Sequence, residues 1–335
     1  MTSKFPLLPT LLAAVALALT APAAACTAFL LEGPDGPRVG KSYDWHTTEG
    51  RVLHNKRGVA KRALTVDPRD TPHAWTSVYS SVTFVQYGRD LPNGGMNDAG
   101  LVVEVLWLDE AVAEARDARP VVNELQWIQH QLDTRRTTAE VVQHLGGVRV
   151  SPVAAAVHYF VCDVTGDCAV IESLAGGVTV SRGDRAITND TASASRGALA
   201  RNAGSTGRSS LARYVRTARA VTTPGGRERA FELLGSVEQS NYTRWQLVYE
   251  PKAQRVAFRT TATGTLHVID VASLARQCSS PVLSRDLDTG TNWSEWRESD
   301  NQELVTSSFA RLGGRVAALA GAVAAWPGRS VCTAR

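Results

Sequence analysis

Apolar runs typical of strands and repeats typical of helices occur in separate blocks along the chain. The strand-like runs cover residues 26–31, 39–43, 76–84, 101–107, 155–162, 168–172, 178–181, 185–188, 244–250, 255–260 and 265–269. Apolar residues recur with helical spacing at 121–132, 138–145, 209–221, 227–234 and 302–325. Because the strands are grouped and the helices collect between the groups, the pattern predicts two sheets covered by helices. This is a layered α+β fold rather than a series of βαβ units.

The first two strand-like runs are joined by Gly33-Pro34-Asp35-Gly36, residues that favour tight turns. We therefore expect a hairpin that starts at Cys26. Two polar segments, 189–208 and 278–301, are rich in small and hydrogen-bonding residues and are interpreted as surface loops.

Residues 1–25 have the composition of a secretory signal peptide. Lys4 lies near the start, an apolar run follows at 11–19, and Ala23-Ala24-Ala25 form a predicted cleavage site. The apolar run is about half of the roughly 20 residues that cross a bilayer, and no later stretch is long and apolar enough. We expect a soluble protein, periplasmic or secreted, with no membrane span. Cleavage leaves residues 26–335, which are 310 of the 335, and we interpret them as a single domain.

The composition and charge of the chain indicate which kinds of ligand it can bind. Apolar residues make up 44% of the chain and 8 residues are tryptophan, which is enough for a large core. Lys and Arg number 36 against 32 Asp and Glu, so loss of Lys4 leaves a net charge of about +3. No basic run is interleaved with aromatic residues as in nucleic-acid channels. We therefore exclude nucleic acid and expect a small-molecule substrate.

Five cysteines in an exported chain indicate disulfides. Pairing Cys162 with Cys168 and Cys278 with Cys332 leaves Cys26 as the odd thiol, although spacing alone does not fix the connectivity. A metal site at Cys162 and Cys168 lacks a matching cluster of histidines or cysteines. We expect neither a metal nor a cofactor.

Cleavage before Cys26 makes its thiol and its α-amine the first groups of the mature chain. An unperturbed α-amine has a pKa of about 7.7–8.0, which suits a general base near neutral pH. One residue then supplies nucleophile and base: the thiol attacks an amide carbonyl, forms an acyl-thioester, and water releases the acid. Asp44, at the end of the second strand-like run, is the nearest carboxylate that strand pairing would return to Cys26.

The residues around Cys26 resemble the choloylglycine hydrolase family, which includes penicillin V acylases and bile salt hydrolases. The resemblance rests on Cys26-Thr27, Gly40-Lys41-Ser42-Tyr43-Asp44-Trp45, Gly95-Met96-Asn97-Asp98-Ala99-Gly100-Leu101, Thr188-Asn189 and Ala212-Arg213-Tyr214-Val215-Arg216. It implies an N-terminal nucleophile hydrolase with a four-layer αββα fold that assembles as a homotetramer.

The resemblance also implies a role for each matching residue. Cys26 would be the nucleophile, Asp44 its polar partner, Asn189 a side-chain donor to the oxyanion and Arg213 the arginine that supports the site. Trp107 lies where the family completes the oxyanion hole with a backbone N–H. Lys41 stands where the family usually has an arginine beside the nucleophile, and lysine does not reproduce the planar donor set of that group.

Substrate expectations follow from the subgroup that the chain resembles. Asn189 and Arg213 are only 24 positions apart, a spacing similar to that of Gram-negative members. This favours penicillin V and N-acyl homoserine lactones, the quorum signals, ahead of bile salt conjugates. Apolar acyl groups need an apolar or aromatic pocket, and Trp45 and Trp107 are the candidates for its walls.

Three alternatives stay open. A lipoprotein signal also ends before a cysteine, and lipidation would make Cys26 the anchor of a binding module. Such signals prefer leucine where this chain has Ala23. A bile salt hydrolase, or an acid amidase that cleaves lipid amides, would keep the fold and change the substrate.

Overall fold

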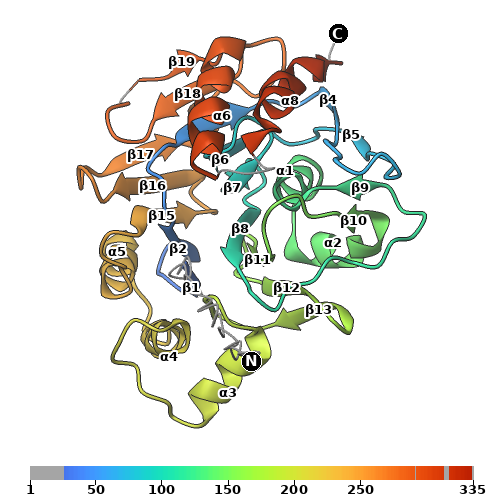
Figure 1. Cartoon of the computed structure of the whole chain (residues 1–335). Helices are drawn as coiled ribbons and strands as arrows, with labels where there is room; N and C mark the ends of the chain where they lie inside the picture. The colour runs from blue at the N-terminus through green and yellow to red at the C-terminus, as the bar shows by residue number, and fades with distance from the viewer. Residues whose placement is uncertain (1–25, 291, 313–316, 334–335) are drawn as a thin grey trace, which may run out of the picture.

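Two antiparallel sheets lie face to face in the computed structural model, which describes residues 26–290, 292–312 and 317–333 (Figure 1). The predicted signal segment, 1–25, lies outside the described residues. Helices cover the outer face of each sheet, so the layers follow the order helix, sheet, sheet, helix. The predicted four-layer α+β architecture is confirmed.

The first sheet has six strands in the order β14-β1-β2-β15-β16-β17. Their bounds are β1 (Thr27–Leu31), β2 (Arg38–Asp44), β14 (Ala186–Ile187), β15 (Thr243–Glu250), β16 (Arg255–Thr260) and β17 (His267–Asp270). β1 and β2 form the predicted hairpin, with Thr27 opposite Ser42. Gly36 closes its turn with a φ of 117°, a conformation that L side chains rarely adopt. β15 pairs with the other edge of β2, which places Thr243 opposite Asp44.

The second sheet has nine strands in the order β13-β12-β11-β8-β7-β6-β3-β18-β19. Their bounds are β3 (Arg51–Asn55), β6 (Ser81–Val85), β7 (Pro92–Asn97), β8 (Val102–Trp107), β11 (Val157–Cys162), β12 (Cys168–Leu174), β13 (Gly177–Arg182), β18 (Leu283–Asp286) and β19 (Ser294–Glu295). A disulfide joins Cys162 to Cys168, which lie opposite each other on β11 and β12. A second joins Cys278 to Cys332. Both predicted disulfides are confirmed, and Cys26 carries a free thiol.

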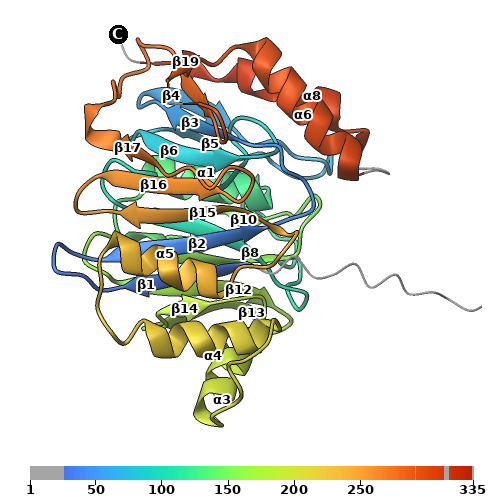
Figure 2. The ribbon, with the colours of Figure 1, turned by 90° about the vertical axis from the view of Figure 1, so that its left-hand side faces the viewer.

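The helices divide between the two outer faces and one end of the molecule. On the outer side of the first sheet lie α4 (Ser210–Ala220) and α5 (Arg227–Ser236), and on the outer side of the second lie α1 (Glu124–Thr134) and α2 (Thr138–Gln143). α3 (Ala192–Ala200) packs against α4 at the lower end of the molecule in Figure 1. α6 (Glu298–Leu312) and α8 (Ala320–Ala325) pack together at the end that also carries β19 (Figure 2). Among the described residues, no helix has the length and apolarity to span a bilayer.

Smaller elements complete the chain. They are β4 (Val59–Arg62), β5 (Ala74–Thr76) and β20 (Val331–Cys332) in one sheet, the parallel pair β9 (Val121–Val122) and β10 (Arg149–Val150), and three 3₁₀ turns at Leu145–Gly147, Val271–Ser273 and Trp326–Arg329.

The core is split into layers by the alternation of side chains along β1. Ala28 and Leu30 pack between the two sheets, whereas Phe29 and Leu31 pack beneath α4 and α5. β1 and β2 are therefore buried along their whole length. Gly40 on β2 leaves room for the Phe29 ring, since a Cβ there would lie 2.3 Å from it. The hairpin that carries Cys26 and Asp44 is thus held by packing on both faces.

Both segments predicted as loops contain regular structure, so those two predictions were wrong. α3 lies within 189–208: Thr191 caps it by accepting from the backbone N–H of Ala194, and Ala198 packs into the core. β18 and β19 lie within 278–301, because β18 pairs with β3 across the second sheet. Small and polar residues hid both elements, since capping and long-range pairing decide their structure rather than apolar periodicity.

Three predicted boundaries also change. The helix predicted at 121–132 begins only at Glu124, because Val121 and Val122 pair with β10 and Asn123 caps the helix. The strand predicted at 76–84 is divided between β5 and β6. The helix predicted at 302–325 is described as α6 and α8, and residues 313–316 lie outside the described residues.

Candidate active site

The hairpin of the first sheet brings Cys26 beside Asp44. Cys26 precedes β1 and Asp44 ends β2, and the Cys26 thiol donates to the backbone carbonyl of Asp44 at an S···O distance of 3.8 Å. Asp44 Oδ1 accepts from Ser42 Oγ at 3.0 Å and from Thr243 Oγ1 at 2.5 Å. Asp44 Oδ2 is buried and has no hydrogen-bond partner among the described residues. The predicted proximity of Cys26 and Asp44 is confirmed, and one carboxylate oxygen is left for a further donor.

Burial sets the protonation of both groups. It raises the pKa of the Cys26 thiol, opposed mainly by the positive charge of Lys41. It also raises the pKa of Asp44 to about 6, against hydrogen bonds from Thr243 and Ser42 and the charge of Arg213. At neutral pH Asp44 is mostly ionised while Cys26 keeps its proton, so attack by sulfur requires a base. No histidine hydrogen-bonds to Cys26 within the described ranges.

Arg213 connects Cys26 to the opposite side of the site. It lies on α4 with 1% of its surface exposed. Its Nη1 donates to the Cys26 carbonyl and to Thr27 Oγ1, both at 2.6 Å, and its Nη2 donates to Asn189 Oδ1 at 3.0 Å. The fork geometry of one guanidinium therefore fixes both the backbone of Cys26 and the side-chain amide of Asn189.

Asn189 and Trp107 are adjacent, as the resemblance predicted. Asn189 Nδ2 donates to the Trp107 backbone carbonyl at 2.8 Å. The backbone N–H of Leu108 donates to the carbonyl of Ala156, just before β11. Because hydrogen-bonded and non-hydrogen-bonded pairs alternate along an antiparallel ladder, the backbone N–H and C=O of Trp107 point away from β11. An amide nitrogen carries two N–H groups, and Asn189 retains the second for a ligand.

Lys41 points between the two sheets and makes no hydrogen bond to Cys26. Its Nζ donates to the Val105 carbonyl and lies 3.6 Å from Glu104 Oε2 on β8. Both side chains are at most 1% exposed, and Tyr249 OH donates to the other Glu104 oxygen. Lys41 therefore acts on Cys26 through its charge. Glu104 was missed by the sequence analysis, although a lone carboxylate inside the apolar run 102–107 was a visible signal.

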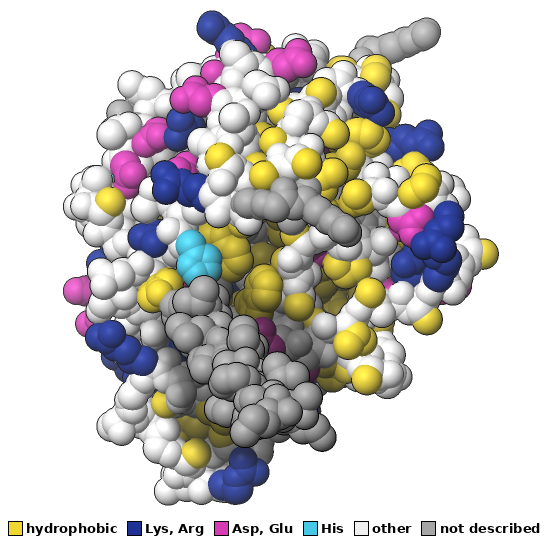
Figure 3. Space-filling view, viewed as in Figure 1, with side chains coloured by type: hydrophobic (Ala, Val, Ile, Leu, Met, Phe, Trp, Pro, Cys, Tyr) yellow, Lys and Arg dark blue, Asp and Glu magenta, His cyan; other side chains and the backbone are white. Residues whose placement is uncertain are grey.

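Cys26 opens into a largely apolar cavity of about 630 Å³. Trp45 and Trp107, the predicted walls, both line it, and their ring centroids are 6.0 Å apart. Further walls come from Phe309 and Leu312 on α6, from Val323 on α8, and from Leu319, the residue before α8. Figure 3 shows hydrophobic side chains gathered around a hollow on this face. The helical residues were missed because no motif links the end of the chain to its beginning.

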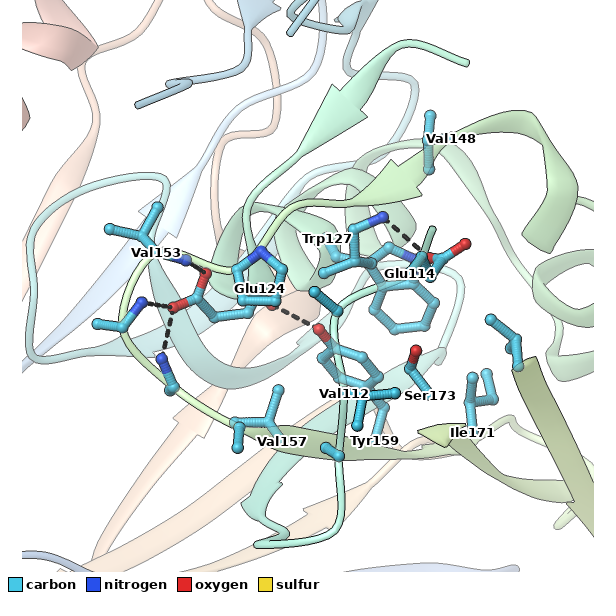
Figure 4. Close-up of a pocket in the computed structure, with 18 of the residues that line it drawn as sticks. Val112, Glu114, Glu124, Trp127, Val148, Val153, Val157, Tyr159, Ile171 and Ser173 are labelled. Carbon is cyan, nitrogen blue, oxygen red and sulfur yellow. Dashed lines mark hydrogen bonds between the residues drawn. The ribbon is translucent and has the colours of Figure 1, made fainter. Parts of the chain in front are cut away.

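A second cavity of about 310 Å³ is drawn in Figure 4, and Glu124 lines both this cavity and the first. Its carboxylate accepts from the backbone N–H groups of Val153, Ala154 and Ala155 at 2.8, 2.9 and 3.0 Å. Residues 153–155 line both cavities. Glu124 thus holds the segment that bounds the larger cavity on this side.

The sequence is similar to that of a known protein family and to that of a curated penicillin V acylase. Residues 32–268 match the family described as acyl-coenzyme A:6-aminopenicillanic acid acyl-transferase. A penicillin V acylase of Pectobacterium atrosepticum is 29% identical in an alignment 192 residues long, and the match covers 49% of this chain and 49% of that protein. The chain thus spans about half the length of the curated relative that it matches.

Solved structures agree on the fold. A penicillin V acylase from Agrobacterium tumefaciens superposes with a TM-score of 0.69 and 26% identity, over 78% of this chain and 91% of the other. A mutant of a conjugated bile acid hydrolase from Clostridium perfringens gives 0.64 with 13% identity, over 81% and 96%. The predicted N-terminal nucleophile hydrolase fold and the resemblance to penicillin V acylases are confirmed.

Glu104 makes the stability of the fold depend on pH. Burial raises its pKa to about 7, opposed by Lys41 and by the hydrogen bond from Tyr249, whereas an unfolded glutamate titrates near 4.3. Between these values the native state binds more protons than the unfolded state, so the free energy of unfolding falls as pH rises. We predict that Glu104→Gln flattens this slope between about pH 4.5 and 7 in urea titrations.

The control is Glu110→Gln, which removes an exposed carboxylate. The dependence of its unfolding free energy on pH should have the same slope as in the unmodified chain. A Glu104→Gln slope equal to that of the unmodified chain would contradict the assignment.

Proposed function

Since the chain belongs to the acyl-coenzyme A:6-aminopenicillanic acid acyl-transferase family, we propose that it is an amidohydrolase. It cleaves linear amide C–N bonds with the thiol of Cys26 as the nucleophile. The observation that carries the proposal is that the free thiol of Cys26 lines an apolar cavity, while the backbone carbonyl of the same residue is joined through Arg213 to Asn189. The similarity to two penicillin V acylases supports the reaction class.

The proposed base is the α-amine of Cys26, exposed when an exported chain loses residues 1–25. A protonated, buried thiol without a histidine partner needs a base close to its own atoms. Asp44 Oδ2, buried and unpartnered among the described residues, offers an acceptor for the ammonium group that forms. The shared contact between the Cys26 thiol and the Asp44 backbone supports this placement.

The reaction proceeds through two acyl transfers. The α-amine takes the thiol proton as sulfur attacks the amide carbon, and the carbonyl electron pair moves onto oxygen. Collapse of this intermediate breaks the C–N bond, and the ammonium returns the proton to the leaving amine. Water then attacks the thioester, gives a proton to the α-amine, and releases the carboxylic acid as the C–S bond breaks. The sulfur recovers its proton, so the cycle closes.

The proposed oxyanion donors are the free N–H of Asn189 Nδ2 and the backbone N–H of Trp107. Donors fixed before the reaction stabilise developing charge more than mobile ones, because they need no reorganisation. Asn189 is held on both sides, by Arg213 at its oxygen and by the Trp107 carbonyl at its nitrogen.

The proposed substrates are penicillin V and N-acyl homoserine lactones, each an amide with an apolar acyl group. The cavity beside Cys26 fits this class, because its walls are aromatic and aliphatic side chains from β2, β8, α6 and α8. The amine half would leave toward solvent. Bile salt conjugates are a less favoured alternative, since the bile acid hydrolase shares only 13% of its residues and so indicates the fold alone.

The direct test is hydrolysis of penicillin V, a series of N-acyl homoserine lactones, taurocholate and an N-acylethanolamine by protein that begins at Cys26. We expect release of the carboxylic acid from at least one of the first two classes. Cys26→Ser should retain the fold and lose several orders of magnitude in kcat, because a hydroxyl is a weaker nucleophile than a thiol beside the same amine. The absence of turnover on every substrate, or normal turnover by Cys26→Ser, would overturn the proposal.

Removal of the proposed oxyanion donor gives a second prediction. Asn189→Ala should lower kcat by roughly 10²- to 10³-fold with little change in KM, because the lost hydrogen bond forms in the transition state. Steady-state kinetics on the best substrate checks this. A drop confined to KM would instead place Asn189 in ground-state binding.

The C-terminal helices should determine which acyl groups fit. Phe309→Ala removes a cavity wall and should raise KM for medium and long acyl chains by roughly 10-fold, because apolar contact is lost. Acetyl and butyryl substrates should change less. Phe231→Ala, which truncates a similarly buried ring on α5 outside this cavity, is the control. Equal losses at every chain length would show that Phe309 supports the fold rather than acyl selection.

A further inference from the structure

A buried histidine and glutamate lie behind the segment that carries Asn189. His158 on β11 and Glu172 on β12 are directly opposite in the strand register, so they share one face of the second sheet. Their side chains are 0% and 4% exposed. Such groups are costly to bury unless their hydrogen bonds are satisfied, so their partners show what they do.

Both nitrogens of His158 are engaged. Nε2 lies 2.8 Å from the Thr188 backbone carbonyl, and Nδ1 lies 3.2 Å from Glu172 Oε1. A carbonyl oxygen only accepts, so Nε2 carries a proton and donates it to Thr188. The imidazole is thereby locked in one orientation with its donor aimed at Thr188.

Glu172 holds the other end of the same segment. Its Oε1 accepts from the backbone N–H of Ala192 at 2.9 Å. Ala192 is the first residue of α3, a position whose N–H has no partner inside its own helix. The residue pair therefore fixes Thr188 and Ala192, which flank Asn189.

The remaining contacts of the segment leave Asn189 little freedom. Its backbone N–H donates to Ser210 Oγ at 2.8 Å, and Thr188 Oγ1 donates to the Ser210 carbonyl at 3.1 Å. Neither His158 nor Glu172 lines the cavity that contains Cys26. The pair instead contacts the segment around Asn189, at Thr188 and at Ala192.

We propose that His158 and Glu172 are positioning residues that set the oxyanion geometry of Asn189. This inference rests on the proposed function. His158 donates to the Thr188 carbonyl, and Glu172 accepts from the Ala192 N–H. Together these contacts place the Asn189 amide so that its second N–H faces the carbonyl that Cys26 attacks. Displacement of a catalytic group by about 1 Å can cost roughly 10²-fold in rate, so loss of either contact acts on the transition state.

The test compares two replacements of His158 in the mature protein on the best amide substrate. His158→Leu removes the donor to Thr188 and should lower kcat roughly 10- to 100-fold, with KM within about 3-fold. His158→Gln offers an amide N–H to the same carbonyl and should recover most of the loss. His130→Leu, which removes another buried histidine far from Asn189, should keep the kcat of the unmodified protein.

A double-mutant cycle separates positioning from general support of the fold. If His158 acts through Asn189, His158→Leu in an Asn189→Ala background should lower kcat by no more than about 3-fold, because the group it positions is already gone. Losses that multiply fully would overturn the proposal, as would a normal kcat in folded His158→Leu. Should His158→Leu fail to fold, Glu172→Gln serves in the same cycle, with an expected loss of roughly 3- to 10-fold.

Different results would contradict the proposed function and the positioning role of His158 and Glu172. If the unmodified protein hydrolyses no amide, the proposed function fails. If it hydrolyses amides and depends on Cys26 and Asn189 but not on His158 or Glu172, only the positioning role fails.

Discussion

The site depends on the hydrogen bonds that the buried guanidinium of Arg213 makes to both of its sides. Taking such a charge out of water is costly unless it is hydrogen-bonded and balanced. Here it donates to the Cys26 carbonyl, Thr27 and Asn189, and the charge of Asp44 favours it. These partners come from the first strand of the chain and from the segment before α3. One side chain therefore fixes the distance between the proposed nucleophile and the proposed oxyanion donor, and the surrounding layers keep water away from it.

A second set of buried polar groups supports the same site from the other sheet. Lys41 and Glu104 meet between the sheets, and His158 and Glu172 hold the ends of the segment around Asn189. Lys41 donates to the Val105 carbonyl, His158 Nε2 faces the Thr188 carbonyl, and Glu172 accepts from the Ala192 backbone N–H. The apolar layers thus form the core of the fold, while a few buried polar contacts hold backbone segments around the site. The cavity beside Cys26 is completed from the far end of the chain by α6 and α8.

The sequence was sufficient for features that depend on nearby residues. The Gly33–Gly36 turn brings Asp44 back to Cys26, and the layered α+β class follows from the grouping of strands and helices. Asn189, Arg213 and Trp107 were accessible only through motif resemblance, because their convergence depends on the packing of α4 and β8. Glu104, His158, Glu172 and Phe309 could not be assigned, since each gains its meaning from a partner on another element. The helix α3 was missed because its structure depends on the Thr191 cap and on small buried residues, among them Ala192 and Ala198, rather than on a stripe of large apolar residues.

The most direct measurement is the mass of the N-terminal peptide from exported protein, taken before and during brief exposure to a slowly hydrolysed amide. We expect a peptide that begins at Cys26 with a free α-amine and one alkylatable thiol. During turnover the same peptide should gain the mass of the acyl group in a thioester that hydroxylamine removes. A peptide with a diacylglyceryl-sized increment would show a lipid anchor at Cys26. A start at another residue, or turnover with no acyl group on Cys26, would equally contradict the proposed nucleophile.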